Sequence, residues 1–341
     1  MSCIKIKQIH FEPSSHCNAA CQLCPRHSYI GDNLYHKKHN LVEQHLDLDI
    51  IRRVLSEPQV QGIGDWLLCG NLGEPMMHPD IADLCEMLNG NSAESWMCVH
   101  TNGGIGNVET WDRMGRLLRL PRGEMIFSID GLEDTNHIYR RNTRWDVIMR
   151  NAEAFIAAGG RAIWKFIEFD YNRHQIEEAR ALSVSMGFHA FTVDRNAAHP
   201  SQPTAAAEYI MDAPPQSTPA LGDFDPESQN REWRMDTTLD CEHCKYSSIF
   251  IDAQARVWPC CHLVTVLYNG DPRRKRVAER YLLDPYGLGW NDLKLHTLQE
   301  IMDNPYWDDL YASLVDNSGM YMCSRACGKN PFRSRDRQIP L

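Results

Sequence analysis

The sequence predicts an α/β protein in which the first 196 residues form a parallel sheet or barrel. Short β-rich runs alternate with amphipathic helical segments from residue 4 to about residue 196, which is the pattern of repeated βα units. The chain has 341 residues, and single hydrophobic cores stop growing at roughly 250–300 residues. We therefore expect one large α/β domain and one smaller domain.

The first domain contains a series of predicted βα repeats. Their strands are expected at residues 4–12, 65–70, 95–101, 124–130, 161–169 and 188–194. The helix after the fourth strand has the clearest limits. Thr143 followed three residues later by Asp146 is similar to a capping box, and Gly159-Gly160 would end the helix. Apolar residues recur between these limits at helical spacing, so we expect this helix to pack on the outside of the sheet.

Residues 197–238 differ in composition from the segments on either side. They carry repeated prolines among alanines, serines and acidic residues. Loops this long without secondary structure are usually functional or disordered. We interpret the segment as a linker, or as a lid over a substrate, between a domain of residues 1–196 and a second domain of residues 239–341.

Composition restricts the class of protein. The net charge of -10 disfavours a nucleic-acid partner. The chain has no apolar run long enough to span a membrane, and its N-terminus lacks the apolar core of a signal peptide, so we expect a cytoplasmic protein without a membrane partner. Its thirteen cysteines then indicate metal ligation, because cytosolic thiols are kept reduced.

Three cysteines directly follow the first predicted strand. Cys17, Cys21 and Cys24 have CxxxCxxC spacing, which gives a 4Fe-4S cube three thiolates and leaves its fourth iron without a protein ligand. His16 or His27 could instead complete a zinc site of three cysteines and one histidine. The spacing and position resemble those of the radical SAM family. In that family, S-adenosylmethionine (SAM) chelates the open iron, and an electron from the cluster cleaves it to a 5'-deoxyadenosyl radical.

The resemblance also implies a fold and a reductant. Six βα units are too few for a closed eight-stranded barrel and resemble the family's partial (βα)6 TIM-like barrel. The cluster loop would then lie at the C-terminal ends of the strands, where βα barrels gather reactive groups. Flavodoxin or ferredoxin is the implied reductant.

The turn after the second strand resembles the family's GGE motif. It reads Leu72-Gly73-Glu74-Pro75, with leucine in place of the first glycine, and backbone groups of this turn bind the SAM ammonium in the family. We expect Gly73 to provide an unusual backbone dihedral. The alternative is an ordinary turn in which Pro75 or Pro79 starts a helix.

Polar residues end the third and fourth strands. Ser128 and Asp130 share one face by the period of two and resemble a family position that contacts the ribose or methionine part of SAM. Thr101 and Asn102 resemble a Thr-Asn-Gly ending beside SAM. The alternatives are a helix cap or turn at Asp130 and a common Asn-Gly turn at Asn102.

Two arginines and an asparagine complete the expected SAM site. Arg140 or Arg141 is placed where relatives use arginine against the SAM carboxylate, an anion that suits a guanidinium. Asn172, after the fifth strand, resembles a family asparagine near SAM. The alternatives are a surface salt bridge for the arginines and a solvated loop residue for Asn172.

A second group of cysteines lies in residues 241–341. It resembles the SPASM and twitch auxiliary-cluster domains, in which a hairpin ends in a Val-x-Pro-Cys-Cys run. Six cysteines fit one auxiliary 4Fe-4S cluster of four ligands, so twitch is favoured over SPASM. The chosen ligands are Cys241, Cys260, Cys323 and Cys327, with Cys244 as a substitute for Cys241 and Cys261 as a buried neighbour. Structural zinc is the alternative. Ala255 replaces the usual hairpin glycine and would strain a turn with positive φ.

These features predict a radical SAM oxidoreductase or maturase. The radical would abstract hydrogen from a small-molecule or peptide substrate, with net oxidation assisted by the auxiliary cluster. Because the barrel begins by residue 4, no N-terminal leader-binding module is expected, which favours a small substrate or a leaderless protein. The alternatives are a peptide or protein maturase that forms a cross-link or modified residue, and a non-catalytic metal-binding or electron-transfer protein. No residue is assigned as the substrate base.

Overall fold

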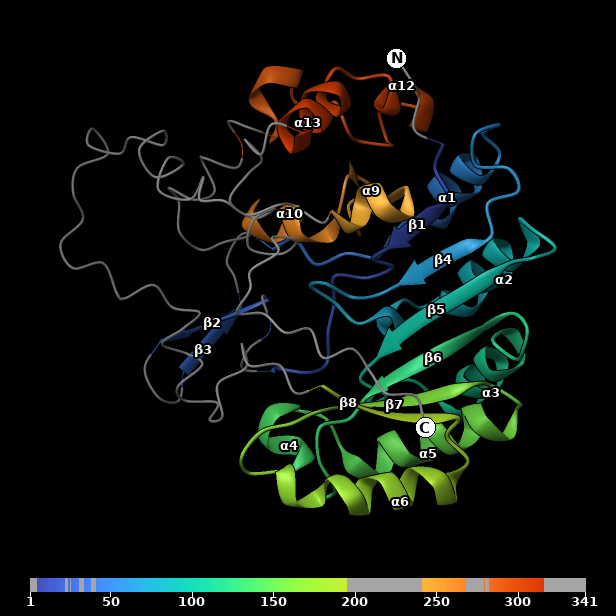
Figure 1. Cartoon of the computed structure of the whole chain (residues 1–341), viewed down its shortest axis with the longest axis vertical. Helices are drawn as coiled ribbons and strands as arrows, with labels where there is room; N and C mark the ends of the chain where they lie inside the picture. The colour runs from blue at the N-terminus through green and yellow to red at the C-terminus, as the bar shows by residue number, and fades with distance from the viewer. Residues whose placement is uncertain are drawn as a thin grey trace.

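A computed structural model describes residues 5–21, 24, 26–30, 34–37, 41–194, 241–267, 279 and 282–315. Its centre is an eight-stranded sheet with the order β10-β9-β1-β4-β5-β6-β7-β8 (Figure 1). The six predicted strands are β1 (Gln8–Phe11), β4 (Asp65–Leu68), β5 (Trp96–Thr101), β6 (Gly123–Ser128), β7 (Ala162–Ile167) and β8 (Ala190–Asp194). Each pairs in parallel with the next, which confirms the α/β class and agrees with a TIM-like barrel.

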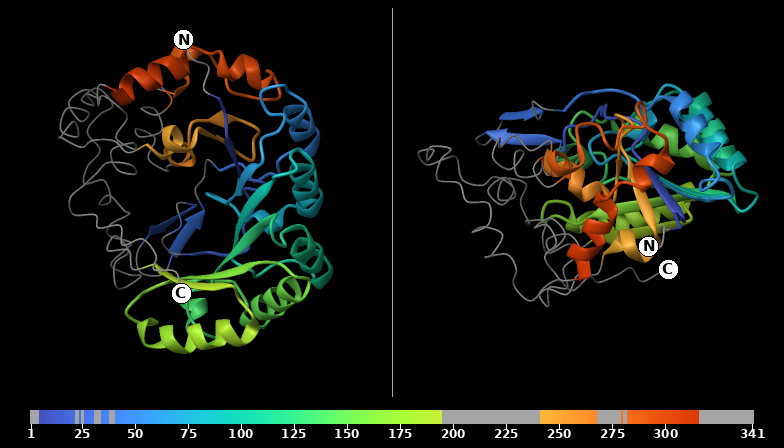
Figure 2. Two further views of the ribbon diagram at one scale, coloured as in Figure 1. Left: turned by 45° about the vertical axis from the view of Figure 1, so that its right-hand side comes forward. Right: turned by 90° about the horizontal axis from the view of Figure 1, so that it is seen from above.

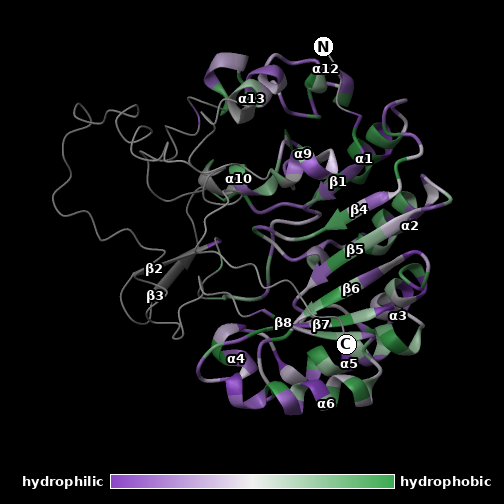
Figure 3. Cartoon of the chain, viewed as in Figure 1, coloured by the Kyte–Doolittle hydropathy of each residue, from purple (hydrophilic) through white to green (hydrophobic). Residues whose placement is uncertain are grey.

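Helices connect successive strands and cover the outer face of the curved sheet (Figure 2). They are α1 (Leu48–Leu55), η1 (Pro75–Met77), α2 (Ile81–Gly90), α3 (Val108–Leu117), α4 (Asn136–Tyr139), α5 (Trp145–Ala157), η2 (Arg173–Gln175) and α6 (Ile176–Met186). Hydrophobic and hydrophilic residues both occur around α5 and α6 (Figure 3). This distribution suits helices with one face on a sheet and the other in solvent.

Side chains of the central strands alternate between two environments. On β5, Met97 and Val99 are fully buried toward the helices, whereas Cys98 and His100 are half-buried on the other face. Because successive strand residues point to opposite sides, the sheet has an apolar outer face. Its inner face is more polar and only partly covered.

The predicted capping box of α5 is wrong. The N-cap residue is Arg144, without a side-chain cap. The Thr143 hydroxyl instead donates to the Arg140 carbonyl at 2.6 Å, and Asp146 pairs with Arg144 at 2.5 Å. The predicted end of the helix is confirmed, because Gly159 follows the C-cap with a φ of 90°, a conformation that favours glycine.

The C-terminal hairpin joins the same sheet, which was not predicted. Strand β9 (Ser248–Ile251) pairs in parallel with β1, and β10 (Val257–Trp258) pairs antiparallel with β9. The other described C-terminal elements are α9 (Glu242–Tyr246), α10 (Cys261–Leu267), η4 (Asp284–Tyr286), α12 (Leu298–Met302) and α13 (Tyr306–Val315). A separate antiparallel pair, β2 (His27–Ile30) and β3 (Leu34–Lys37), was also not predicted.

Side-chain contacts also connect the first and last parts of the chain. The amide of Gln44 donates to the Ala253 carbonyl at 2.7 Å. The carboxylate of Glu57 accepts from the backbone N–H groups of Leu298 and Gln299, at 2.8 and 3.0 Å. The segment of residues 197–238 lies outside the described residues, so its interpretation as linker or lid stays a prediction. Among the described helices, none has the length and hydropathy to cross a membrane.

Candidate functional site

The three cysteines of the CxxxCxxC motif follow β1 at the edge where the parallel strands end. Cys21 is buried, whereas Cys17 and Cys24 are half-buried. They pack beside a small apolar cluster that contains Tyr139, Ile167 and Phe169. In βα barrels this edge gathers reactive groups, so the motif lies where the sequence predicted it.

Burial controls the chemistry of these thiols. It raises the pKa of all three, that of Cys24 to about 11. A buried free thiolate is therefore disfavoured, and metal coordination is the usual way to deprotonate such a group. The Arg140 guanidinium acts in the opposite direction on Cys21 and lowers its pKa.

The surroundings of the motif bear on whether it holds an iron-sulfur cube or a single zinc ion. The ring of His16 stacks on that of His45 with the ring centroids 4.6 Å apart, a contact that leaves the ring nitrogens of His16 able to bind a metal. Across the described residues, no three metal-ligating side chains converge on one ion. A cube spaces its thiolates more widely than one ion does, and the neighbouring guanidinium suits its negative charge.

The turn after β4 is anchored to β5 through Glu74. The buried Glu74 carboxylate accepts from the Thr101 hydroxyl at 2.7 Å and from the Asn102 backbone N–H at 2.8 Å. Desolvation raises the pKa of Glu74, and these hydrogen bonds lower it. The structure thus brings together the predicted residues Gly73, Glu74, Thr101 and Asn102. The side chains of Glu74 and Thr101 bond to each other, which leaves backbone groups of the turn to meet a ligand.

Gly73 is required for a different reason from the one predicted. Its φ is not positive, so the expected unusual dihedral is wrong. A Cβ on Gly73 would instead lie 1.8 Å from the carbonyl oxygen of Ser14. Only glycine lets this turn approach the backbone of the cluster loop so closely.

Asn102 links the end of β5 to the cluster loop. Its side-chain amide donates to Asn18 Oδ1 at 2.9 Å and lies 4.0 Å from Cys17 Sγ. Asn18 in turn donates to the Gly104 carbonyl at 3.2 Å. These contacts fix the first cysteine of the motif relative to the sheet.

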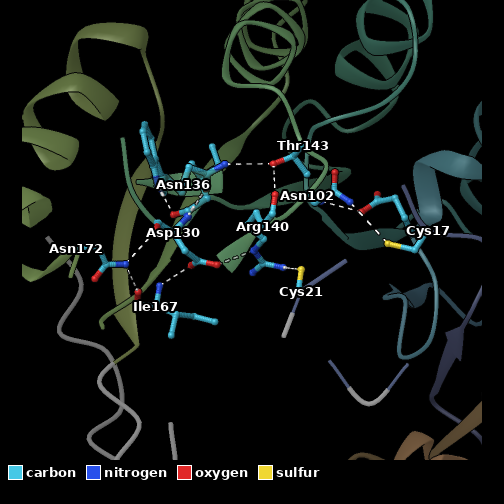
Figure 4. Close-up of polar contacts among 12 residues, drawn as sticks. Cys17, Cys21, Asn102, Asp130, Asn136, Arg140, Thr143, Ile167 and Asn172 are labelled. Atoms are coloured by element: carbon cyan, nitrogen blue, oxygen red, sulfur yellow. Dashed lines mark hydrogen bonds and ion pairs between the residues drawn. The ribbon is translucent and has the colours of Figure 1, made fainter. Parts of the chain in front are cut away.

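Asp130 is the centre of a second network, shown in Figure 4. Its fully buried carboxylate pairs through Oδ2 with Arg140 Nε at 2.6 Å and accepts the Ile167 N–H through Oδ1 at 2.7 Å. Arg140 Nη1 then donates to Cys21 Sγ at 3.7 Å. Asn136 Oδ1 accepts from the Asp130 backbone N–H at 2.9 Å. Arg140 is therefore joined directly to the cluster loop, and Asp130 is joined to it through Arg140.

The other predicted SAM residues differ in their surroundings. The buried Asn172 amide donates to the carbonyls of Asp130 and Ile167, at 2.9 and 3.0 Å, and so braces this network. Ser128 lies on the inner face, half-buried, beside its register partner Lys165. The carbonyl of Arg141 accepts from the Ala20 N–H at 2.9 Å, and its side chain is half-buried.

Two buried ionisable residues of the site were missed. Glu12 follows β1 and accepts from the Leu72 N–H, and burial raises its pKa to about 8. Arg26 donates to the carbonyls of Ser15 and Leu72 and pairs with Glu43. A charged residue directly after the apolar first strand was a usable signal for Glu12. Nothing in the local pattern distinguished Arg26.

The inner face also carries titratable residues between the strands. Lys165 Nζ pairs with Asp194 at 3.4 Å, and both side chains are about one-third exposed, at 35% and 33%. Burial and the charge of Lys165 lower the pKa of His100 to about 4. His100 makes no side-chain hydrogen bond with another described residue and is neutral at physiological pH.

The second cysteine group is described only in part. Cys241 is the N-cap residue of α9, Cys244 is exposed on that helix, and Cys260 and Cys261 follow β10. The Cys261 carbonyl accepts from the Asn71 amide at 2.7 Å, next to the Gly73 turn. Cys323 and Cys327 lie outside the described residues, so the four-ligand set stays a prediction. Ala255 has the positive φ, 63°, that its place in the hairpin required.

Comparison with known proteins identifies the first part of the chain. Residues 11–180 match the Radical SAM superfamily. No match was found among curated proteins.

Solved structures share the fold at low sequence identity. Native anSMEcpe with bound AdoMet has a TM-score of 0.52 and 13% identity over 94% of this chain and 89% of that chain. The same protein with AdoMet and the Cp18Cys peptide has a TM-score of 0.51 and 10% identity over 94% and 88%. SuiB of Streptococcus suis, bound to S-adenosylmethionine, has a TM-score of 0.49 and 14% identity, and the match covers 82% of this chain and 66% of SuiB.

Proposed function

We propose that this protein is a radical SAM enzyme whose 4Fe-4S cluster is held by Cys17, Cys21 and Cys24. The observation that carries the proposal is that two hydrogen-bond networks contact the thiol loop. Asn102, held by Glu74, lies next to Cys17, and Arg140, held by Asp130, donates to Cys21. When bound, the cluster supplies the electron that cleaves SAM to a 5'-deoxyadenosyl radical and methionine. Flavodoxin or ferredoxin is the proposed source of that electron.

The residues around the thiols would hold SAM by its polar ends. The backbone of the turn at Gly73 and Glu74 faces the cluster loop and would bind the ammonium group. Arg141 is half-buried, and no described residue pairs with its guanidinium, which makes it the candidate for the carboxylate. Ser128 has a hydroxyl without a described partner and would bind the ribose or methionine part. Asp130 and Asn172 position these groups, because their own side chains are already bonded.

The substrate would lie against the inner face of the sheet, next to SAM. Lys165 is a cation on this face, and among the described residues its carboxylate partner is Asp194 alone, at 3.4 Å, which leaves hydrogen-bond donors available. His100, which is neutral and makes no side-chain hydrogen bond with another described residue, would accept a proton from the substrate. This arrangement suits a small molecule or a peptide that carries an anionic group. The adenosyl radical would take a hydrogen atom from the substrate. For net oxidation, the substrate radical would then give an electron to an auxiliary cluster and a proton to His100.

An auxiliary 4Fe-4S cluster in the C-terminal part completes the proposal. Cys260 immediately follows the hairpin, and the next residue, Cys261, contacts the Gly73 turn through Asn71. An electron carrier at this position would be close to the substrate. The remaining ligands are proposed as Cys241 or Cys244 with Cys323 and Cys327.

Cleavage of SAM tests the proposed function directly. We expect the anaerobically reconstituted protein, reduced with dithionite, to produce 5'-deoxyadenosine and methionine. Cys21→Ala should abolish both products. Cys85→Ala, which changes a cysteine on the outer helix α2, is the matched control and should retain them.

Iron and sulfide analysis gives an independent measurement. About eight iron and eight sulfide per chain would support two 4Fe-4S clusters. Zinc in place of iron, or SAM cleavage that survives in Cys21→Ala, would contradict the proposed function.

A further inference from the structure

We propose that Arg140 sets the reduction potential of the cluster by donating a hydrogen bond to Cys21, and that Asp130 limits how much of its positive charge the cluster experiences. This inference rests on the proposed function, because it requires a cluster on Cys17, Cys21 and Cys24. It separates Arg140 from Arg141: Arg140 acts on the cluster, and Arg141 is left to bind SAM.

Two nitrogen atoms of the Arg140 guanidinium make contacts with neighbouring side chains. Nε pairs with Asp130 Oδ2 at 2.6 Å, and Nη1 donates to Cys21 Sγ at 3.7 Å (Figure 4). The Arg140 side chain is only 16% exposed, and that of Asp130 is fully buried. The guanidinium also lies over the ring of Tyr139, 5.1 Å from its centroid. A charge held in this low-dielectric position is screened little by solvent.

The surrounding backbone holds this pair in place before any ligand binds. The Asp130 carboxylate accepts the Ile167 N–H, and its own N–H donates to Asn136. The Arg140 carbonyl accepts from the Thr143 hydroxyl at 2.6 Å. The guanidinium therefore cannot turn away from Cys21 without straining or breaking its ion pair with Asp130, a carboxylate that the Ile167 N–H holds in place.

The sign of the effect follows from charge. Reduction adds an electron to an already anionic cluster, and hydrogen bonds to its sulfurs and nearby charges are among the factors that set its potential. A donor and cation beside Cys21 stabilises the reduced state and makes the potential less negative. The Asp130 carboxylate opposes this effect. Removing the charge of Arg140 and removing that of Asp130 should consequently shift the potential in opposite directions.

The experiment is a redox titration of the reconstituted full-length protein without SAM. It follows the electron paramagnetic resonance signal that Cys21→Ala lacks, which belongs to the cluster on Cys17, Cys21 and Cys24 and not to the auxiliary cluster. Arg140→Gln should shift the midpoint potential to a more negative value. Asp130→Asn, which keeps an oxygen acceptor for the Ile167 N–H, should shift it to a less negative value. Arg140→Lys keeps the charge and should fall between wild type and Arg140→Gln. Arg144→Gln removes a nearby exposed arginine charge and should leave the potential at the wild-type value.

The outcomes separate the inference from the proposed function. Equal potentials in wild type, Arg140→Gln and Asp130→Asn, each with an intact cubane signal, would overturn the inference and leave the proposed function standing. Shifts of the same sign in Arg140→Gln and Asp130→Asn would also overturn it. They would indicate a structural disturbance of the site, because an effect of charge requires opposite signs. If Arg140→Gln assembles no cluster, Arg140→Lys and Asp130→Asn still carry the test. A wild-type protein without a cubane signal would overturn both.

Discussion

Glu12 is a buried carboxyl group between the Leu72 turn and the C-terminal hairpin, and it makes stability depend on pH. Desolvation and the neighbouring Asp252 raise its pKa from 4.5 to about 8. Between these values the folded protein holds a proton that the unfolded chain has released. The free energy of unfolding therefore falls as pH rises from about 4.5 to 8, by at most about 1.4 kcal/mol per pH unit from this group, and levels off above that range.

Glu12→Gln should remove this dependence. Glutamine keeps an oxygen that accepts from the Leu72 N–H but does not ionise. We expect the stability of the variant relative to wild type to increase steadily between pH 5 and 8 in urea unfolding experiments. Glu153→Gln, at an exposed position on α5, is the control and should follow the wild-type pH curve. Parallel curves for Glu12→Gln and wild type would contradict the assignment.

Gly73 offers a second test at the scale of one residue. Gly73→Ala would place a methyl group 1.8 Å from the Ser14 oxygen, so the turn must move away from the cluster loop. We expect a loss of about 1–3 kcal/mol in the free energy of unfolding and weaker SAM binding. Gly90→Ala, at the end of α2 where a Cβ meets nothing within 4 Å, should be neutral or stabilising. Calorimetric SAM titration and urea unfolding measure both effects.

At this scale the sequence predicted which residues gather but not which contacts they use. The period of two placed Ser128 and Asp130 on one face, and motif similarity placed Arg140 near SAM. Asp130 lies beyond the end of β6, however, where the chain is free to turn its carboxylate toward the Ile167 N–H and Arg140. Such partners come from residues 10 and 37 positions away. Local spacing contains no information about contacts at that distance.

At the scale of elements, the hairpin between β9 and β10 carries a strained turn. Ala255 has a φ of 63°, a conformation that costs a non-glycine residue about 1–2 kcal/mol. Asp252 nevertheless organises the turn by accepting the backbone N–H groups of Gln254 and Arg256, at 2.9 and 3.0 Å. The alanine is tolerated because its neighbours fix the turn.

Ala255→Gly should relieve that strain. Glycine adopts the conformation freely but loses more entropy on folding, about 0.5–1 kcal/mol. We therefore expect a gain of up to about 1 kcal/mol in the free energy of unfolding, measured by urea denaturation. Ala253→Gly, in the same turn without a positive φ, is the matched control and should be destabilising. Destabilisation of equal size in both variants would show that the turn is not strained.

Elements with local signals were predicted well, and elements defined by distant partners were not. Alternating apolar runs located all of the strands from β1 to β8 that belong to the main sheet. The hairpin was also expected from its Val-Trp-Pro-Cys-Cys run. Its attachment to β1 depends on pairing Gln8 with Ser248, 240 positions apart, for which neither strand carries a local mark.

At the scale of the whole molecule, the first and last described segments form one sheet and one hydrophobic core. Strand β9 pairs with the edge of β1, and Glu57, which follows the C-cap of α1, accepts from two N–H groups at the start of α12. The first N–H groups of a helix need such partners. The described C-terminal part therefore pairs with backbone groups of β1, and a side chain of the barrel accepts backbone N–H groups of the C-terminal part.

This reciprocity predicts a single cooperative unfolding transition. Far-ultraviolet circular dichroism follows all helices and strands, and tryptophan fluorescence reports on residues such as Trp164 in β7 and Trp307 in α13. Both measurements should give the same urea midpoint.

Glu57→Ala leaves two helix N–H groups without their acceptor, at a cost of about 1–3 kcal/mol. It should shift that one transition to lower urea without splitting it. Glu109→Ala, at an exposed carboxylate on α3, should not move it. If Glu57→Ala shifted only a minor phase and left the rest unchanged, the C-terminal part would be an independently folding unit, and its pairing with β1 would not couple it to the barrel.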